Sequence, residues 1–254
     1  MKWIKPGYEF DELSDVILAA SSKEVFIWGA GYFGEVVYDV LIKEIQLVGY
    51  IDSNPNKQHS MLNGLTIYSP DILKTRDVNK TIVLVAAGWT KDIFDELEQF
   101  GFAQNIFSFS IDDFVAIYMM YKYKKLYLVN VNISIGERCS LKCEKCSSLV
   151  PYYTLPKEYS LEEIKDTLLA FFKVTDYVCS LGLTGADAML SPHLMKIIDF
   201  VGEIYGGTIG NIQLYTSGVL IPKPRLIDLM KKHNVYYRFT DYDLPKIQKI
   251  PEII

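Results

Sequence analysis

Three cysteines lie within eight residues of one another, at Cys139, Cys143 and Cys146. Thiolates are the usual ligands of iron–sulfur clusters, and a 4Fe–4S cube normally takes four of them. A C-x3-C-x2-C segment supplies three, so one iron of the cube would keep no protein ligand. The spacing therefore predicts a metal centre with an open coordination position, at which a cofactor or substrate could bind.

The same cysteines could instead hold a zinc ion, which takes four ligands in a structural site. Cys179 and His193 are the candidates for the fourth ligand. Zinc ribbons prefer two separated cysteine pairs, however, and Cys179 falls in an apolar run that predicts a buried strand. Because the chain has only 4 cysteines and three of them cluster, no disulfide framework is indicated, and we expect a reducing cytoplasm.

A glycine-rich turn, Gly29-x-Gly31-x-x-Gly34, forms the second motif, with Asp52 at the end of the next apolar run. The first glycine permits a tight turn, the second lets a diphosphate approach the backbone, and the third lets helix pack on strand. The helix that follows offers free N–H groups to an anion, and Asp52 could accept a hydrogen bond from a ribose hydroxyl. The motif predicts a site for NAD or another nucleotide, although the same glycines can serve only to make a compact turn.

The elements around this turn alternate between strand and helix. Apolar runs at 25–28, 46–51 and 81–86 predict buried strands, and helical patterns cover 10–20, 36–41 and 91–100. Such alternation predicts a doubly wound, Rossmann-like parallel sheet covered on both faces, which we assign to residues 1–109. A capping-box pattern at Ser110 and Asp113 begins a helix that we expect to connect two domains, over 110–127.

The second half repeats the strand and helix pattern. Its expected strands cover 128–135, 177–183, 211–215 and 235–240, with polar and glycine-rich residues just after them. In such folds the loops at the carboxyl ends of the strands hold the site, and the cysteine loop follows the first strand. An open sheet edge would be a liability unless it is covered, so a second chain could complete this sheet in an oligomer.

Two more segments join the cysteines in resembling the radical S-adenosylmethionine (SAM) superfamily. The segment 183–192, LTGADAMLSP, lies where that family has a GGEPLLHP-like sequence, and Thr216-Ser217-Gly218 follows the third strand as a similar turn does in relatives. The resemblance implies a short partial (β/α) barrel over 128–254. It also implies that Cys139, Cys143 and Cys146 bind a 4Fe–4S cluster.

Further roles follow from the same resemblance. The open iron would chelate the amino and carboxylate groups of SAM, and a flavodoxin or ferredoxin would supply the electron that releases a 5′-deoxyadenosyl radical. The SAM-binding residues would be Gly185, Ala186, Asp187, Thr216 and Ser217, with the Asp187 carboxylate receiving the SAM ammonium.

The segment departs from the family pattern at several positions. Lys145 stands where an aromatic residue is usual, Ala186 replaces a glycine, and Asp187 is one methylene shorter than the usual glutamate. Four expected strands also fall short of the six that the family's barrel commonly has. These departures are typical of a shortened member whose radical chemistry is weakened or lost.

The first half resembles small nucleotide-binding Rossmann domains of bacterial sugar and surface-polysaccharide proteins. The resemblance rests on the segments FIWGAGYFG, GYIDSNPNK and GLTIYSP. It implies that the small-molecule substrate is a nucleotide-activated sugar or a polysaccharide precursor.

Composition narrows the class of function. The chain has 26 Lys and Arg against 31 Asp and Glu, which gives a net charge of -5. A chain with this charge is not expected to bind nucleic acid or an anionic membrane. Its longest apolar stretch, 81–89, is far shorter than a membrane span, and the first residues lack a secretion signal. The resemblance of the cysteine segment implies a radical SAM enzyme, and the composition is compatible with it. The alternatives are a non-catalytic scaffold that binds a cluster or zinc, and an NAD-dependent oxidoreductase.

Overall fold

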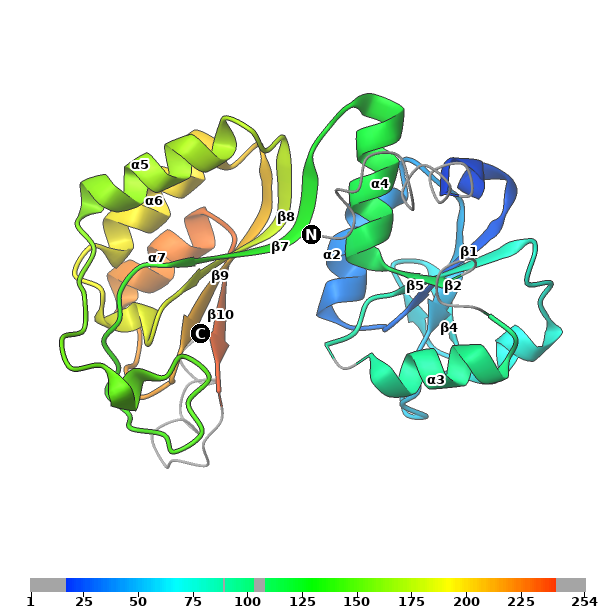
Figure 1. The fold of residues 1–254 in the computed structure, drawn as a ribbon, viewed down its shortest axis with the longest axis horizontal. Helices are drawn as coiled ribbons and strands as arrows, with labels where there is room; N and C mark the ends of the chain where they lie inside the picture. The colour runs from blue at the N-terminus through cyan, green and yellow to red at the C-terminus, as the bar shows by residue number, and fades with distance from the viewer. Residues whose placement is uncertain (1–16, 89, 103–107, 241–254) are drawn as a thin grey trace. The chain divides into compact units, whose positions relative to one another are not determined.

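The computed structural model describes residues 17–88, 90–102 and 108–240. These residues fall into two compact units, which divide between Val129 and Asn130 (Figure 1). Each unit is an α/β structure built on a largely parallel sheet. The expected helix over 10–20 lies mostly outside the described residues, and its described end forms the 3-10 helix η2 (Ala19–Ser22). Among the described helices, none has the length and apolar character needed to cross a membrane.

The first unit has a sheet of six strands in the order β3-β4-β2-β1-β5-β6. All of its strand pairs are parallel except the short hairpin of β3 and β4. Its elements are β1 (Glu24–Trp28), α2 (Tyr32–Leu41), β2 (Leu47–Ile51), β3 (Met61–Leu62), β4 (Leu65–Tyr68), η3 (Pro70–Thr75), β5 (Thr81–Val85), α3 (Lys91–Gln99), β6 (Ser108–Ser110) and α4 (Ile111–Tyr123).

Both faces of this sheet are covered. Successive side chains of a strand point to opposite faces, and all four of Val25, Phe26, Ile27 and Trp28 are buried. Phe26 and Trp28 pack with Leu97 of α3 in one core cluster. The expected parallel sheet with two covered faces is therefore present.

The helix α4, which we expected to connect two domains, belongs to the first unit. Ser110 caps its first turn by accepting a hydrogen bond from the Asp113 amide, as the capping pattern predicts. The buried Tyr118 hydroxyl donates to the carbonyl of Glu44 at 3.2 Å. Because Tyr118 is buried and bonded to the backbone of Glu44, α4 extends the core of the first unit.

The second unit has four strands in the order β10-β9-β8-β7, and β8, β9 and β10 run parallel. The observed strands agree with the four expected ones to within two residues at each end. The elements are β7 (Tyr127–Ser134), η4 (Val150–Tyr152), α5 (Leu161–Phe172), β8 (Tyr177–Thr184), η5 (Ala188–Leu190), α6 (Leu194–Tyr205), β9 (Ile209–Thr216), α7 (Pro224–Lys232) and β10 (Val235–Phe239).

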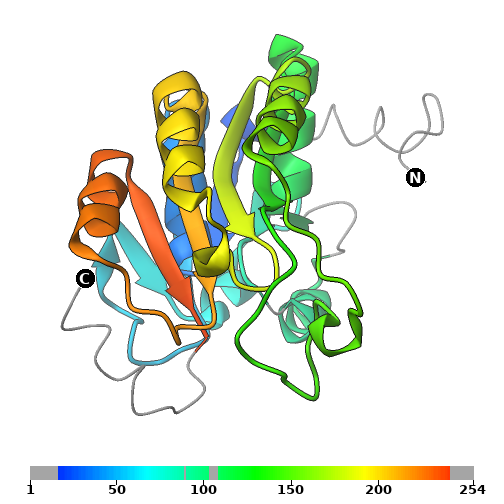
Figure 2. The same cartoon turned by 90° about the vertical axis from the view of Figure 1, so that its left-hand side faces the viewer.

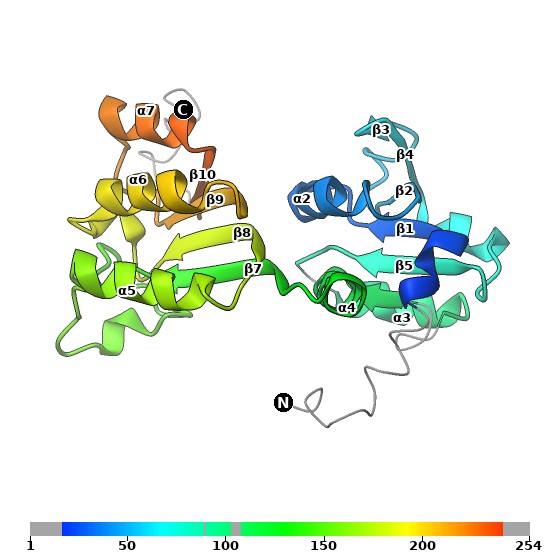
Figure 3. The same ribbon diagram turned by 90° about the horizontal axis from the view of Figure 1, so that it is seen from above.

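All three α-helices of this unit cover one face of its sheet, as Figures 2 and 3 show. Leu181, Leu183, Ile212 and Leu214 pack against them in the core of the unit. The alternate residues point to the other face and are mostly polar. One-sided cover leaves that polar face and the carboxyl ends of the strands available to build a site.

Candidate functional site

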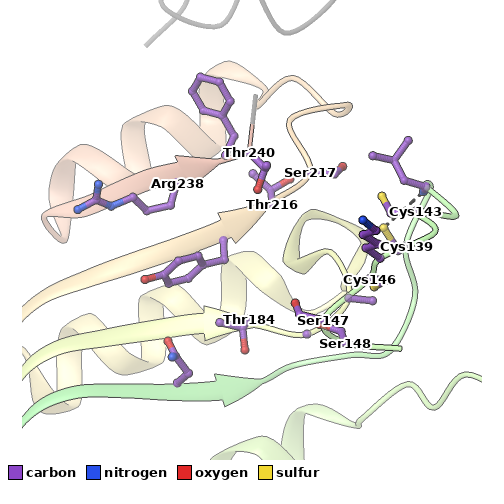
Figure 4. Close-up of a pocket in the computed structure, with 17 residues that line it drawn as sticks. Cys139, Cys143, Cys146, Ser147, Ser148, Thr184, Thr216, Ser217, Arg238 and Thr240 are labelled. Atoms are coloured by element: carbon purple, nitrogen blue, oxygen red, sulfur yellow. Dashed lines mark hydrogen bonds between the residues drawn. The ribbon is translucent and has the colours of Figure 1, made fainter. Parts of the chain in front are cut away.

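A cavity of about 750 Å³ lies where the strands of the second unit end (Figure 4). Parallel strands bring their carboxyl ends to one edge of the sheet, so loops that are distant in sequence meet there. The cysteine loop follows β7, Gly185 and Ala186 follow β8, and Ser217 follows β9. All three segments line the cavity, so the structure brings together the residues predicted on separate motifs.

Cys139, Cys143 and Cys146 lie together at one end of this cavity in Figure 4. Each is a free, partly exposed cysteine. Burial raises the pKa of the Cys139 thiol, and the nearby Asp187 and two cysteines raise it further. A metal centre would have to displace the proton from this thiol, since metals bind the thiolate.

The spacing of the sulfurs distinguishes a cube from a single ion. Zinc–sulfur bonds of about 2.3 Å in a tetrahedral site place two sulfurs about 3.8 Å apart. Within the described parts of the chain, the sulfurs are not among the ligand groups that converge to within 4.8 Å of one another. At least two of the three sulfurs therefore lie farther apart here than they would around one zinc ion. In a cluster, each thiolate would bind a different iron.

Neither candidate for a fourth zinc ligand faces the cavity. Cys179 is buried within β8, and His193 caps the start of α6, where its amide donates to the Ser191 hydroxyl. The described residues that line the cavity include no histidine, aspartate or glutamate. Among them, therefore, only the three thiols are strong metal ligands.

Gly185 and Ala186 join the loop after β8 to the cysteine loop. Gly185 has φ +136°, and a Cβ there would lie 2.1 Å from the carbonyl oxygen of Gly136. The Ala186 amide donates to the same carbonyl at 3.2 Å, and the Asp187 amide donates to the Arg138 carbonyl at 2.9 Å. These contacts fix the backbone directly before Cys139, which is why glycine is needed at position 185.

Asp187 has a different role from the one that the sequence predicts. Its carboxylate is buried and accepts hydrogen bonds from the Thr216 hydroxyl at 2.8 Å, the Met189 amide at 3.1 Å, and the Ser217 amide and hydroxyl. It is not among the residues that line the cavity. The carboxylate is therefore not positioned for the direct contact with an ammonium group that we expected. The short aspartate reaches the turn after β9 and positions Thr216 and Ser217.

Thr216 and Ser217 line the cavity beside the thiols. Their hydroxyls donate to Asp187, so their oxygen lone pairs remain able to accept. The amides of Gly218 and Val219 use part of that capacity, at 3.3 and 3.4 Å. The turn is thereby rigid, and it presents two hydroxyl oxygens at the mouth of the strands.

Sequence reasoning missed Asn132, Tyr215 and Arg238, which line the cavity from three different strands. The signal was present, because polar residues alternate with apolar ones in β7 and β9 and so share one face of the sheet. What the sequence alone could not supply was the pairing of strands that puts these three residues beside one another.

The glycine-rich turn of the first unit is tightly built. Gly29 has φ +123°, and a Cβ there would lie 2.3 Å from the Ala86 carbonyl oxygen. A Cβ at Gly34 would lie 2.1 Å from the Gly29 carbonyl oxygen. Both glycines are thus required by backbone approach alone. Gly31 is roomier, since only the Lys57 ammonium comes within 4 Å of a Cβ placed there.

Asp52 is close to this turn, as predicted, but its carboxylate is engaged within the unit. One oxygen accepts from the Ala30 amide at 3.0 Å and from Lys57 at 3.2 Å, and the other accepts from the Asn54 amide at 2.9 Å. Lys57 also donates to the Ala30 carbonyl at 2.9 Å. In this arrangement Asp52 and Lys57 hold the turn closed.

Comparison with known proteins gives a family match within the first unit. Residues 21–106, about a third of the chain, match a family described as C2185-like, N-terminal. One similar solved structure is that of RSP, a Rex-family repressor, with 16% identity over 36% of this chain and a TM-score of 0.29. The match spans 47% of that repressor chain, about half of its length. No curated protein matches.

These matches overturn both expected family assignments. Nothing among them supports membership of the radical SAM superfamily for residues 128–254, so that assignment is wrong. The first unit matches the C2185-like family in place of the sugar-protein domains. The physical reason is that a short cysteine motif after a strand reports a local ligand geometry, which chains of different ancestry can share.

Proposed function

We propose that the second unit binds a 4Fe–4S cluster through Cys139, Cys143 and Cys146 and uses it with SAM in a radical reaction. The observation that carries this proposal is that three free thiols open onto one cavity whose described lining offers no fourth strong ligand. A cluster with one open iron needs three thiolates and no fourth protein ligand, and this lining is what supports the proposal. The cluster is argued from the thiols of this site, whereas SAM and the radical reaction are carried over from the resemblance of the cysteine segment and the two turns that follow β8 and β9.

Cys139, Cys143 and Cys146 would hold the cluster, which would supply the electron for reductive cleavage of SAM. The protein's part is to hold the reactants. Thr216 and Ser217 would accept hydrogen bonds from the SAM ammonium, and Asp187 would position both through its own bonds. The Gly185–Ala186 backbone keeps the cysteine loop in place.

The remaining parts of the proposal concern the surroundings of the site. The four-stranded sheet would act as a short partial barrel, and the first unit as a Rossmann-like nucleotide-binding domain. The substrate would be a small molecule such as a nucleotide-activated sugar or a polysaccharide precursor. A flavodoxin or ferredoxin would serve as electron donor, in the cytoplasm, and a second copy could cover an edge of the sheet.

Anaerobic reconstitution with iron and sulfide tests the cluster. We expect a brown protein with about four irons per chain. Cys143→Ala should lose most of this iron, whereas Cys179→Ala should retain it, because Cys179 is buried in β8 and does not line the cavity. Equal iron in the two variants would contradict the assignment of ligands.

Reduction of the reconstituted protein in the presence of SAM tests the chemistry. Release of 5′-deoxyadenosine by the wild type and not by Cys143→Ala is the expected result. A stable cluster without release would favour the non-catalytic scaffold. Stoichiometric zinc in protein purified in air, with no iron uptake, would favour the zinc site.

Nucleotide binding by the first unit is tested separately by titration with NAD. A Gly31→Asp substitution fits sterically and adds a negative charge at the start of α2, so it should weaken any binding of a diphosphate. NAD affinity that Gly31→Asp abolishes would support the NAD-dependent oxidoreductase. Equal titration curves for the two proteins would remove that alternative.

A further inference from the structure

The cavity extends from the thiols along the polar face of the sheet of the second unit. Asn132 on β7, Tyr215 on β9 and Arg238 on β10 line this part, which we call the sheet end of the cavity. Arg238 is the register partner of Tyr215 across the β9–β10 pair. In Figure 4 Arg238 lies well away from the three cysteines, so the cavity has two chemically distinct ends.

Gly182 makes room at the sheet end. A Cβ at this position would lie 2.0 Å from the Asn132 Oδ1 atom and 2.9 Å from the Tyr215 Cε2 atom. A larger residue would clash with both side chains. Glycine at this position lets the Asn132 amide and the Tyr215 ring lie close together over the sheet, where both line the cavity.

Hydrogen bonds hold Tyr215 in a defined orientation. Its hydroxyl donates to the Gln213 Oε1 atom at 2.6 Å, and the Gln213 amide donates to the Ser180 hydroxyl at 2.6 Å. The Ser180 hydroxyl donates to Asn211 at 3.2 Å. Ser180, Gln213 and Asn211 are buried, so the ladder is a fixed support for the ring. Such a support pre-organises the sheet end for a ligand.

The charges of the cavity favour an anion. Lys145 and Arg238 are the charged residues that line its described part, and no carboxylate lines that part, although the whole chain has a net charge of -5. Lys145 is in the cysteine loop, where it would offset the negative charge of a thiolate-bound cluster. Arg238 is too far along the sheet for that task. Its guanidinium offers the planar, paired donors that suit a carboxylate or a phosphate.

We infer that the sheet end binds a negatively charged group of the substrate, a carboxylate or a phosphate, with Arg238 as its counter-charge and the Asn132 amide as a further donor. This inference rests on the proposed function only for the placement of the reacting centre at the thiol end. The substrate is then an anion long enough to reach from Arg238 toward the thiols. A diphosphate of an activated sugar has this character, and so does a carboxylic acid.

Calorimetric titration of the full chain tests the inference, with inorganic pyrophosphate and malonate as the two probes. The probe that binds more tightly identifies the anion. Arg238→Gln should weaken its binding at least about tenfold, which is the loss of one charge-assisted contact. Arg225→Gln is the matched control, because Arg225 is an exposed arginine on α7 that does not line the cavity, and it should leave the affinity within about twofold.

Two further variants keep the test decisive. Arg238→Lys retains the charge but not the paired donors, so its affinity should fall between wild type and Arg238→Gln. Asn132→Ala removes the second donor from an exposed position of β7 and should weaken the same probe by a smaller factor. Equal affinities for Arg238→Gln and Arg225→Gln, or no binding of either probe by the wild type, would overturn the inference.

The same titrations on Cys143→Ala separate this inference from the proposed function. A protein without iron should still bind the anion in an Arg238-dependent way. If the wild type takes up no iron yet shows that dependence, the proposed function fails and the anion site stands. If the cluster forms and SAM is cleaved while Arg238→Gln binds both probes as the wild type does, the anion site fails alone.

Discussion

The strand-end loops of the two units are built in the same way. In each, a glycine with positive φ follows a buried strand and presses against a carbonyl: Gly29 against Ala86, and Gly185 against Gly136. In each, a carboxylate after a strand binds the amide of a neighbouring loop: Asp52 binds Ala30, and Asp187 binds Ser217. The shared construction shows that these glycines and acids hold backbone segments together.

The two loops differ in whether a side chain covers them. In the first unit Lys57 bonds to both Asp52 and the Ala30 carbonyl, so a side chain of the unit itself closes the turn. In the second unit the corresponding edge opens into the cavity with the three thiols. The comparison teaches that a motif of glycines and an acid identifies a strand-end turn, whereas ligand binding depends on what the rest of the fold leaves uncovered.

The largest expected effect comes from adding a methyl group at the two glycines with positive φ that approach a carbonyl closely. Gly29→Ala and Gly185→Ala combine positive φ with a backbone clash, so each should lower the free energy of unfolding by about 2–4 kcal/mol. Chemical denaturation measures the change. Gly88→Ala and Gly207→Ala are the controls, because nothing lies within 4 Å of a Cβ at either position. A cost at Gly185 no greater than at Gly207 would show that the close approach is absent in solution.

Neutralising the two carboxylates should lower the free energy of unfolding by different amounts in the two units. Asp187→Asn places an amide against four donors in a buried site and should cost about 2–3 kcal/mol of unfolding free energy. Asp52→Asn should cost less, because the Asp52 side chain is 14% exposed and water can replace part of its bonding. Denaturation of both variants under one set of conditions gives the comparison. An equal or larger loss for Asp52→Asn would reverse the contrast.

Alkaline pH should weaken each unit through one tyrosine, which is buried in the first unit and partly buried in the second. Burial raises the pKa of Tyr50 to about 12 in the first unit and that of Tyr237 to about 12 in the second. Because the folded-state pKa lies above the unfolded value near 10, this contribution is complete below pH 10 and is lost between pH 10 and 12.

The Tyr50→Phe variant has no hydroxyl to ionise, so its comparison with the wild type measures the contribution of Tyr50. Between pH 10 and 12, the unfolding free energy of the wild type should fall by about 1–2 kcal/mol more than that of Tyr50→Phe. Tyr237→Phe provides the matching measurement for the second unit, where the hydroxyl donates to the Leu220 carbonyl at 2.8 Å. Parallel pH profiles for wild type and Tyr50→Phe would contradict the raised pKa of Tyr50.

The smallest effect should come from the lysine that closes the first turn. Lys57→Ala removes an ion pair whose lysine is 43% exposed, so the loss of unfolding free energy should stay below about 1 kcal/mol. Arg138→Ala, which removes the exposed Arg138–Glu158 pair beside the cysteine loop, should be similarly mild. A loss well above that for Lys57→Ala would mean that the closed turn supports the first unit more than its exposed contacts indicate.

Local patterns in the chain were enough to determine most of the secondary structure. Apolar runs give β1, β2 and β5, and the alternation of polar and apolar residues gives β7. The capping pattern at Ser110 and Asp113 gives the start of α4. These features depend on neighbours within a few residues, and so a sequence can specify them by itself. The grouping of the three cysteines in one short loop is equally local.

Tertiary structure alone decided which of these groups face a ligand. Asp187 and Asp52 have the residue type and position of ligand-binding acids, yet each is consumed by hydrogen bonds to a loop that is distant in sequence. Asn132, Tyr215 and Arg238 come together only because β7, β9 and β10 lie in one sheet. A side chain's role depends on the partners that compete for its lone pairs and donors, and the pairing of strands that are distant in sequence selects those partners.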